Sequence, residues 1–310
     1  MKITASRRSY CLVLILFFFY SDLSDPQGPA EEFGDETKIG HVGDMQDHSS
    51  SGNPFEDREE IKVSTEPTGD IDSWLFSLYE GQTGIFYEDS NVQIGIKMRS
   101  SGPDLEMDFY FGNKTDSSLE LKKFFIPPSP AFRVSCGESP KIIDRDSQVQ
   151  IQSQWTCTAP YVASPIVQIN YVNSRGESMA RTLTLPLPLT KFCKAVMIPA
   201  SVFSTRWNQV TGSPYKLQET TVVSKQMSKS SVIKVLDKLN LQTLDEVNLG
   251  IESIFAVSIF TFSAHDVIQV PCMVSISGYE SATLVITVAT ADATVSQALK
   301  STLISIFGRS

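Results

Sequence analysis

The chain has 310 residues, a hydrophobic fraction of 41% and a formal net charge of −9, so it is long enough for two domains with packed cores. The charge is uneven: residues 25–72 hold 14 acidic and three basic side chains, a net of −11, while residues 1–24 carry +2 and the remainder sums to zero. Nucleic-acid binding needs a basic surface that neutralises phosphates, and no segment supplies one. We therefore expect no nucleic-acid partner.

The apolar N-terminus, residues 1–24, combines basic residues with an apolar run from Tyr10 to Tyr20. This run is too short to span a bilayer, and it has the shape of a secretory signal peptide. The stretch that follows, Ser21 to Asp25, lacks a clean small-x-small cleavage site. Two interpretations stay open: a signal that directs secretion, and an artefact of a truncated gene model.

Residues 25–75 are acidic and rich in Ser, Gly and Pro, with little periodic hydrophobicity. Such a composition buries too little apolar surface to fold, and it predicts a disordered linker. Within it, Asn53, Pro54 and Phe55 form a tripeptide that can turn and present one aromatic ring to a pocket. The tripeptide is either a chance match or a motif that recruits a partner.

Residues 76–189 predict a β-sandwich, because short segments with alternating apolar residues follow one another with turn residues between them. The clearest strand begins at Leu105, where apolar residues alternate with Glu106, Asp108 and Tyr110. A period of two places these three side chains on the wet face. Tyr110 on that face indicates either cross-strand packing or contact with a partner. The other predicted strands are centred on 92–98, 119–126, 134–136, 149–157, 167–171 and 179–185.

Residues 190–310 predict a mixed α/β unit that begins after Pro186 and Pro188, since proline cannot donate within a strand ladder. Ser230 or Ser231 is expected to cap a helix. Helical spacing of apolar residues falls at 203–210, 232–239 and 293–306, and three strands of a meander are predicted at 254–262, 267–276 and 283–288. The sequence thus predicts two subdomains of α+β class.

The sequence offers no catalytic or metal-binding pattern. None of its five cysteines stand at Cys-x-x-Cys spacing, and it lacks the phosphate-loop, His-Glu-x-x-His and nucleophile-elbow motifs. His265 lies in a predicted turn, and Glu88 and Asp89 are expected to be solvated loop charges. We expect no enzyme activity, no catalytic residues, no metal and no cofactor.

A secreted or surface β-sandwich adhesion protein is the hypothesis that follows from a genuine signal peptide. It predicts cleavage near residue 24 and a glycan on Asn113, which forms an acceptor triplet with Lys114 and Thr115. It also allows a disulfide between Cys136 and Cys157, although the cysteine count suits a reducing compartment better.

Taken in order, these segments resemble the C-terminal appendage (ear) of alpha-adaptin, the large subunit of the endocytic clathrin adaptor complex. The resemblance implies an immunoglobulin-like β-sandwich followed by an α/β platform with an antiparallel sheet and flanking helices. It also implies a non-enzymatic hub for short peptide motifs. It covers residue 78 to the C-terminus and is carried by 84–87 with 92–97, by the aromatic-Gly-Asn-Lys-Thr run at 109–115, by the junction at 185–192 and by 203–210.

The family's sandwich site takes Trp-x-x-Phe-type peptides, and its positions match Tyr110, Lys97 and Gln148. In their predicted strands all three alternate with the apolar residues, so they lie on the polar face. A sheet face with an aromatic, a cation and an amide suits an extended peptide with aromatic side chains. We expect this site to be the better preserved of the two.

The family's platform site seats the rings of Asp-Pro-Phe-type and Phe-x-Asp-x-Phe-type peptides against a tryptophan that matches Trp207, with Phe203 on the same predicted helix. Trp207 as a simple core residue is the alternative. The family's charged clamp is mostly absent, which removes the stronger, charge-assisted bonds. The corresponding residues here are Lys216, Ser275, Ser277 and Val285.

The resemblance implies partners and a location. The partners are accessory endocytic proteins with these three motif types, EH-domain proteins that bind Asn53-Pro54-Phe55, and other adaptor subunits if the chain is part of a longer one. The location is cytoplasmic and membrane-associated at clathrin-coated pits, with secretion as the alternative. An appendage of another coat or adaptor large subunit would share the fold and differ in peptide preference.

Overall fold

The computed structural model describes residues 71–308, except 174, 224–225, 246, 248 and 250–251. The apolar N-terminus, most of the predicted linker and Asn53-Pro54-Phe55 lie outside the described residues. No helix within the described part of the chain is both long enough and apolar enough to cross a membrane.

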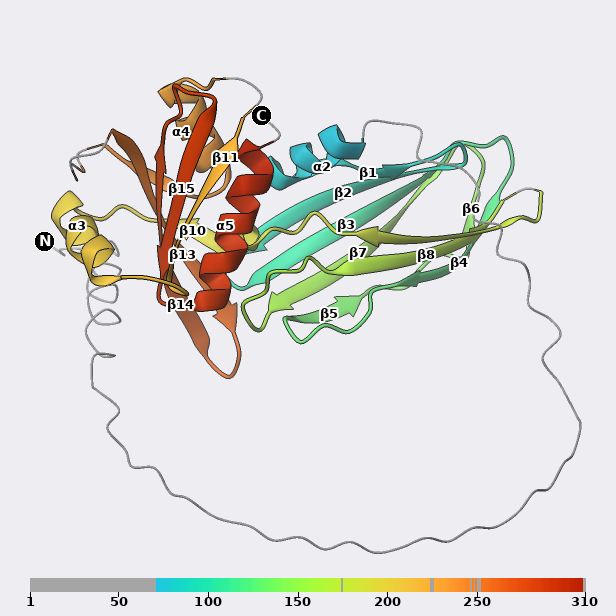
Figure 1. Cartoon of the computed structure of the whole chain (residues 1–310). Helices are drawn as coiled ribbons and strands as arrows, with labels where there is room; N and C mark the ends of the chain where they lie inside the picture. Colours follow the sequence, from blue (N-terminus) through green and yellow to red (C-terminus); the bar gives the residue numbers. More distant parts are fainter. Residues whose placement is uncertain are drawn as a thin grey trace, which may run out of the picture. The chain divides into compact units, whose positions relative to one another are not determined.

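Residues 83–184 form a β-sandwich of two antiparallel sheets (Figure 1), as the sequence predicts. The first sheet has the order β1-β2-β3-β7-β5 and the second the order β6-β4-β8-β9. The strands of the first sheet are β1 (Thr83–Glu88), β2 (Val92–Ser101), β3 (Asp104–Asn113), β7 (Gln148–Cys157) and β5 (Phe132–Cys136). Those of the second are β6 (Ile142–Ile143), β4 (Leu119–Phe125), β8 (Ile166–Val172) and β9 (Ser178–Thr184).

Alternation in the sequence determines which side chains fill the sandwich. In β3 the residues Leu105, Met107, Phe109 and Phe111 are all buried, as their spacing predicts. The rings of Phe109 and Phe111 meet Phe124 of the second sheet edge-on, with centroids 4.9 and 5.6 Å apart. Because a slip of one residue would turn this apolar set toward water, the core fixes the register of β3.

A helix covers the start of the sandwich, where the sequence predicted the end of a linker. This helix, α2 (Ile71–Glu80), buries Leu78 completely, and Phe76 and Tyr79 pack against the same core. Helix α2 therefore begins at Ile71, within the segment predicted as a linker up to residue 75. The reason is that the apolar residues around Phe76 follow a helical spacing and pack on β1.

Residues 193–307 form the platform, an antiparallel sheet with helices on both faces (Figure 1). The strand order is β10-β13-β14-β15-β11, and β12 also pairs with β13. The strands are β10 (Cys193–Ala195), β11 (Lys216–Val222), β12 (Gln242–Leu244), β13 (Ser253–Ser263), β14 (Val267–Ser277) and β15 (Thr283–Thr290). The helices are α3 (Ala200–Gln209), α4 (Lys229–Lys238) and α5 (Ala293–Phe307), and the 3-10 helix η1 (Leu189–Phe192) directly precedes β10.

The two faces of the platform sheet are buried by different helices. Phe255 and Met273 belong to a small cluster with Phe203 and Trp207 of α3. The alternate residues of these strands face the other way, and Ala256, Val274 and Val288 are among them. They belong to one cluster with Leu236 of α4 and with Leu299 and Leu303 of α5. Figure 1 shows α3 and α5 on opposite sides of the sheet. The predicted meander and three helices are confirmed, with boundaries that differ from the predicted ones by at most three residues.

Helix α4 begins one turn earlier than the sequence predicts. Its N-cap is Ser228, whose Oγ accepts a hydrogen bond from the Ser231 backbone N–H at 3.2 Å. Ser230 and Ser231 are therefore not the cap. All three serines lie close enough to compete for this role, so the sequence alone did not distinguish them.

Candidate functional site

The outer face of the first sandwich sheet brings together the three residues predicted for peptide binding. Tyr110 lies on β3, Lys97 on β2 and Gln148 on β7, the three central strands of that sheet. Tyr110 is half-buried, and the other two side chains are exposed. Their order across the face follows from the register, in which Tyr110 stands opposite Gly95 on one side and Gln150 on the other.

Lys97 and Gln148 are diagonal neighbours of Tyr110. Lys97 is two residues beyond Gly95, and Gln148 is two residues before Gln150. Diagonal neighbours on antiparallel strands have Cα atoms about 7–8 Å apart, within reach of long side chains. The cation, the ring and the amide therefore follow one diagonal line across three strands.

Gly95 leaves one side of the Tyr110 ring without a cross-strand neighbour. A Cβ atom built on Gly95 would lie 3.9 Å from the Tyr110 Cβ and 3.7 Å from the Gly84 carbonyl oxygen, which are ordinary contact distances. A small side chain would thus fit the fold. The glycine keeps the surface beside the aromatic ring open.

Of the two cations on β2 that face outward beside Tyr110, Arg99 is paired and Lys97 is not, within the part of the chain that the structure describes. Arg99 contacts Glu106 at 2.8 Å and Asp108 at 3.3 Å. Asp108 stands opposite Lys97 in the register but is 4% exposed and bound to Arg99. Lys97 has no ion pair with any residue that the structure describes. Its ammonium group is available to a carboxylate of a ligand.

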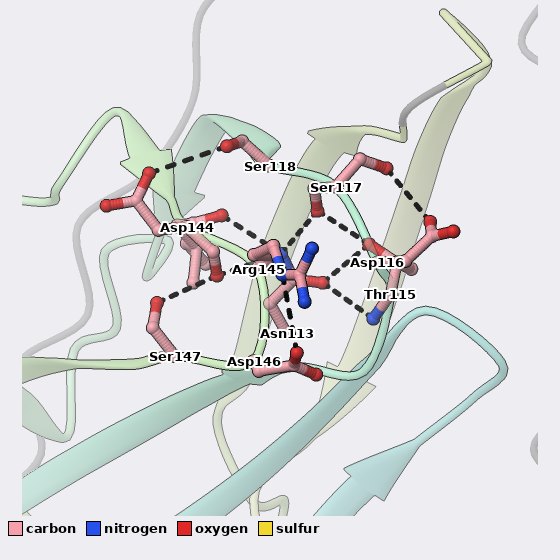
Figure 2. Close-up of polar contacts among 10 residues, drawn as sticks. Asn113, Thr115, Asp116, Ser117, Ser118, Asp144, Arg145, Asp146 and Ser147 are labelled. Atoms are coloured by element: carbon pink, nitrogen blue, oxygen red, sulfur yellow. Dashed lines mark hydrogen bonds and ion pairs between the residues drawn. The ribbon is translucent and has the colours of Figure 1, made fainter.

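Asn113 closes the end of β3 that follows Tyr110 (Figure 2). Its side-chain N–H group donates to the carbonyl oxygens of Ser117 at 2.8 Å, Ile143 at 3.0 Å and Asp144 at 3.0 Å. Its Oδ1 accepts from the N–H of Thr115 at 2.9 Å and from its hydroxyl at 2.8 Å. The side chain therefore joins the β3–β4 turn to the segment after β6.

Two predictions of the secreted hypothesis are wrong in this structure. The Asn113 amide nitrogen, the atom a glycan would modify, is consumed by buried hydrogen bonds, and the residue is 5% exposed. In the register of β5 and β7, Cys136 lies opposite Ser153 and Cys157 lies opposite Phe132. The two cysteines are therefore four residues apart along the strands, roughly 13 Å. Disulfides need Cα atoms within about 7 Å, and both thiols are free.

Trp207, the platform candidate, contacts three side chains of the protein. Its ring stacks on Phe203 with centroids 5.6 Å apart and planes 18° apart, and Phe255 meets it edge-on at 5.9 Å. The Lys216 Nζ lies 4.2 Å from the Trp207 centroid and donates to the Trp207 carbonyl at 2.8 Å. Trp207 is 9% exposed. Desolvation by burial lowers the pKa of Lys216.

Phe203 does not reach the surface. It is 0% exposed, so its ring supports Trp207 from behind, and a surface-bound peptide would not touch it. Ser275 is also buried, whereas Ser277 and Val285 are half-buried on the same sheet face. Phe203, which was predicted at the platform site with Trp207, is therefore placed behind the Trp207 ring.

Asp89, which the sequence suggested was solvated, is fully buried. Its carboxylate accepts the hydroxyls of Tyr87 at 2.8 Å and Tyr171 at 2.7 Å, with Arg181 at 3.8 Å. Burial is the main cause that raises the pKa of Tyr87 to about 12, and burial also raises the pKa of Tyr171. Sequence reasoning missed this network because Tyr171 is 82 residues away. Its position between the sheets gives it a structural role.

The structure contains no group of His, Cys, Asp and Glu side chains suited to metal binding among the residues it describes. A β-sandwich joined to an α/β platform is the fold that the resemblance to an appendage implies. Residues 191–307 match the family model described as the C-terminal domain of alpha adaptin AP2. The C-terminal part of the chain is therefore similar to an alpha-adaptin C-terminal domain, and the resemblance drawn from the sequence is confirmed.

Curated relatives agree with this family. The chain is 25% identical over 183 residues to AP-2 complex subunit alpha-2 of Dictyostelium discoideum, covering 59% of this chain and 18% of the relative. It is 28% identical over 161 residues to AP-2 complex subunit alpha-1 of Arabidopsis thaliana, covering 52% and 16%. The chain thus spans less than a fifth of the length of these relatives.

Among solved structures, the GAE domain of GGA2p from Saccharomyces cerevisiae is similar to part of the chain. It has 16% identity and a TM-score of 0.29, and the match covers 35% of this chain and 98% of that domain. The yeast GGA1 GAE domain in the structure named GGA1_GAE domain-P21 has 13% identity and the same TM-score, with 33% of this chain and 97% of that domain covered.

Proposed function

We propose that this protein is a clathrin-adaptor appendage that binds short aromatic peptide motifs of endocytic accessory proteins, at clathrin-coated pits on the cytoplasmic side. The alpha-adaptin match over residues 191–307 and the AP-2 alpha relatives support the adaptor class. Assembly with other adaptor subunits is part of the proposal. It applies if this chain is one portion of a longer subunit.

The open face around Tyr110 is the observation that carries the proposal. The Tyr110 ring is half-exposed, and its cross-strand neighbour Gly95 has no side chain, so an aromatic side chain of a peptide can pack beside it. Lys97 can pair with a peptide carboxylate, and Gln148 can donate to or accept from a peptide backbone. Because the three groups lie on a diagonal over three strands, an extended peptide of the Trp-x-x-Phe type would span them.

The platform site is the weaker of the two proposed sites. Both the burial of Trp207 and the uncharged character of Ser275, Ser277 and Val285 argue against strong binding of Asp-Pro-Phe-type or Phe-x-Asp-x-Phe-type peptides. A peptide carboxylate would find Lys216 as its nearest cation on that sheet face. We therefore propose that Trp-x-x-Phe-type peptides bind more tightly than the aspartate-bearing types.

Titration of both peptide types against variants of the full chain tests this order. Tyr110→Ala should weaken Trp-x-x-Phe-type binding at least tenfold, the loss expected when an aromatic anchor is removed from an interface. Phe125→Ala is the matched control, because Phe125 is an exposed aromatic (41%) on the other sheet of the sandwich. Loss of both peptide types in Trp207→Ala alone, with Tyr110→Ala unchanged, would overturn the proposal.

A second partner class is proposed for the segment that precedes the described residues. Asn53, Pro54 and Phe55 would recruit EH-domain proteins by presenting the Phe55 ring to a pocket. Comparison of the full chain with its Phe55→Ala variant in binding to an isolated EH domain tests this. Equal binding by both proteins would show that the tripeptide is a chance match.

A further inference from the structure

Both faces of the Trp207 ring are occupied by the protein itself. Phe203 stacks on one face at 5.6 Å, which leaves no room for another group between the two rings. The Lys216 ammonium, 4.2 Å from the same centroid, must therefore lie over the opposite face. Phe255 closes one edge. The remaining exposure of Trp207, 9%, is too small for a ligand ring to stack on it.

Two features keep Lys216 in this position. Its backbone pairs with Ala289 in a regular ladder without a bulge, so its side chain stays on the sheet face that α3 covers. Its Nζ also donates to the Trp207 carbonyl at 2.8 Å. The ammonium is thus bound at once to the ring and to the backbone of a single residue.

No carboxylate within the described part of the chain pairs with Lys216. The neighbouring acid on the same strand, Glu219, has the opposite parity and pairs with Lys300 at 2.6 Å. The cation on α3, Arg206, bonds to Gln209. On β11, β14 and β15 the other residues that share the sheet face with Lys216 are uncharged, among them Gln218, Thr220, Ser275, Ser277, Val285 and Thr287.

We propose that Lys216 is an internal competitor that closes the platform site and selects its ligands. The proposal rests on the proposed function in that it treats the surface around Trp207 as a peptide site. A ligand ring can reach the indole only after the ammonium leaves. A carboxylate beside the ligand's aromatic residue offers the ammonium a charged partner, which a neutral peptide does not. Lys216 therefore converts a general aromatic-binding surface into one that requires an adjacent acid.

The test uses two peptides that differ in one group, an Asp-Pro-Phe-type peptide and the same peptide with Asn in place of Asp. Binding to the full chain is measured by fluorescence polarisation for wild type, Lys216→Ala and Lys216→Arg. We expect Lys216→Ala to bind the Asn peptide about 5- to 30-fold more tightly than wild type, which corresponds to the removal of one partly desolvated cation–π contact. Lys216→Arg keeps a cation over the ring and should retain the preference for the acidic peptide.

Unchanged or weaker binding of the Asn peptide to Lys216→Ala would overturn the proposal, and so would an absence of binding in every variant. Lys216→Gln keeps a long side chain without the charge. It replaces Lys216→Ala as the variant that lacks the cation over Trp207 if the alanine variant is poorly folded. A Trp-x-x-Phe-type peptide titrated against the same variants reports on the sandwich site. Its binding separates a failure of the Lys216 proposal from a failure of the proposed function.

Discussion

Replacement of Asn113 by Ala should destabilise the sandwich strongly, because one side chain serves several buried backbone groups (Figure 2). Its two N–H bonds are shared among three carbonyls, and its oxygen accepts from Thr115. Counted as three to four real bonds at about 1 kcal/mol each, the loss is about 3–4 kcal/mol. Asn113→Asp should cost more at pH 7, since a carboxylate oxygen would then face those carbonyls.

Urea denaturation of wild type, Asn113→Ala and Asn113→Asp at pH 7 measures these free energies. Thr115→Val is the control, because it removes only the hydroxyl contact of the same turn and should cost about 1 kcal/mol. A loss below about 1 kcal/mol for Asn113→Ala would refute the reasoning. So would an Asn113→Asp variant that is more stable than the alanine variant at pH 7.

Three further predictions concern single residues. Tyr171→Phe should lower the free energy of unfolding by about 1.5–3 kcal/mol, because it removes a hydrogen bond to the buried Asp89 carboxylate. Urea denaturation measures this free energy, and a change within about 0.5 kcal/mol would contradict a structural role for the Asp89 network. Lys191 donates to the Gly81 carbonyl in a buried site, and desolvation lowers its pKa from 10.5 to about 8. Between pH 8 and 10.5 the unfolded chain therefore binds more protons than the folded chain. The free energy of unfolding, measured relative to that of Lys191→Met, should rise by about 3 kcal/mol over this range. If denaturation at matched pH shows no change in this difference, the pKa of Lys191 is not lowered. Gly95→Val should fold with a thermal midpoint close to that of wild type yet lose Trp-x-x-Phe-type binding in the titration; retained binding would show that the surface beside Tyr110 is not used.

The buried residues of β3 could be predicted from the sequence, because apolar residues recur at every second position of a strand that packs one face on the core. The spacing of Leu105, Met107 and Phe109 predicted their burial and, by elimination, the outward position of Tyr110. The platform meander was also predicted as three strands, although β13 is buried on both faces and shows no alternation. Strands of three residues such as β10 and β12 contain no full period, and the polar sequence of β11 shows none, so these strands were not predicted.

The features that the sequence did not reveal depend on residues distant in the chain. Asp89 is buried only because Tyr171 supplies a hydroxyl from the other sheet. Trp207 was readable as an aromatic on an amphipathic helix, but its cover by Lys216 depends on β11, which was missed. The Asn113 triplet fits a glycan acceptor in sequence, and only the carbonyls of Ile143 and Asp144 show that its amide is already used.

The central claim is that the outer face around Tyr110 binds an extended aromatic peptide. The most direct measurement is nuclear magnetic resonance mapping of amide shifts on the full chain during titration with a Trp-x-x-Phe-type peptide. We expect the largest shifts on β2, β3 and β7 around Lys97, Tyr110 and Gln148. Shifts confined to α3 and β11, or to the opposite sheet around Phe125, would contradict it.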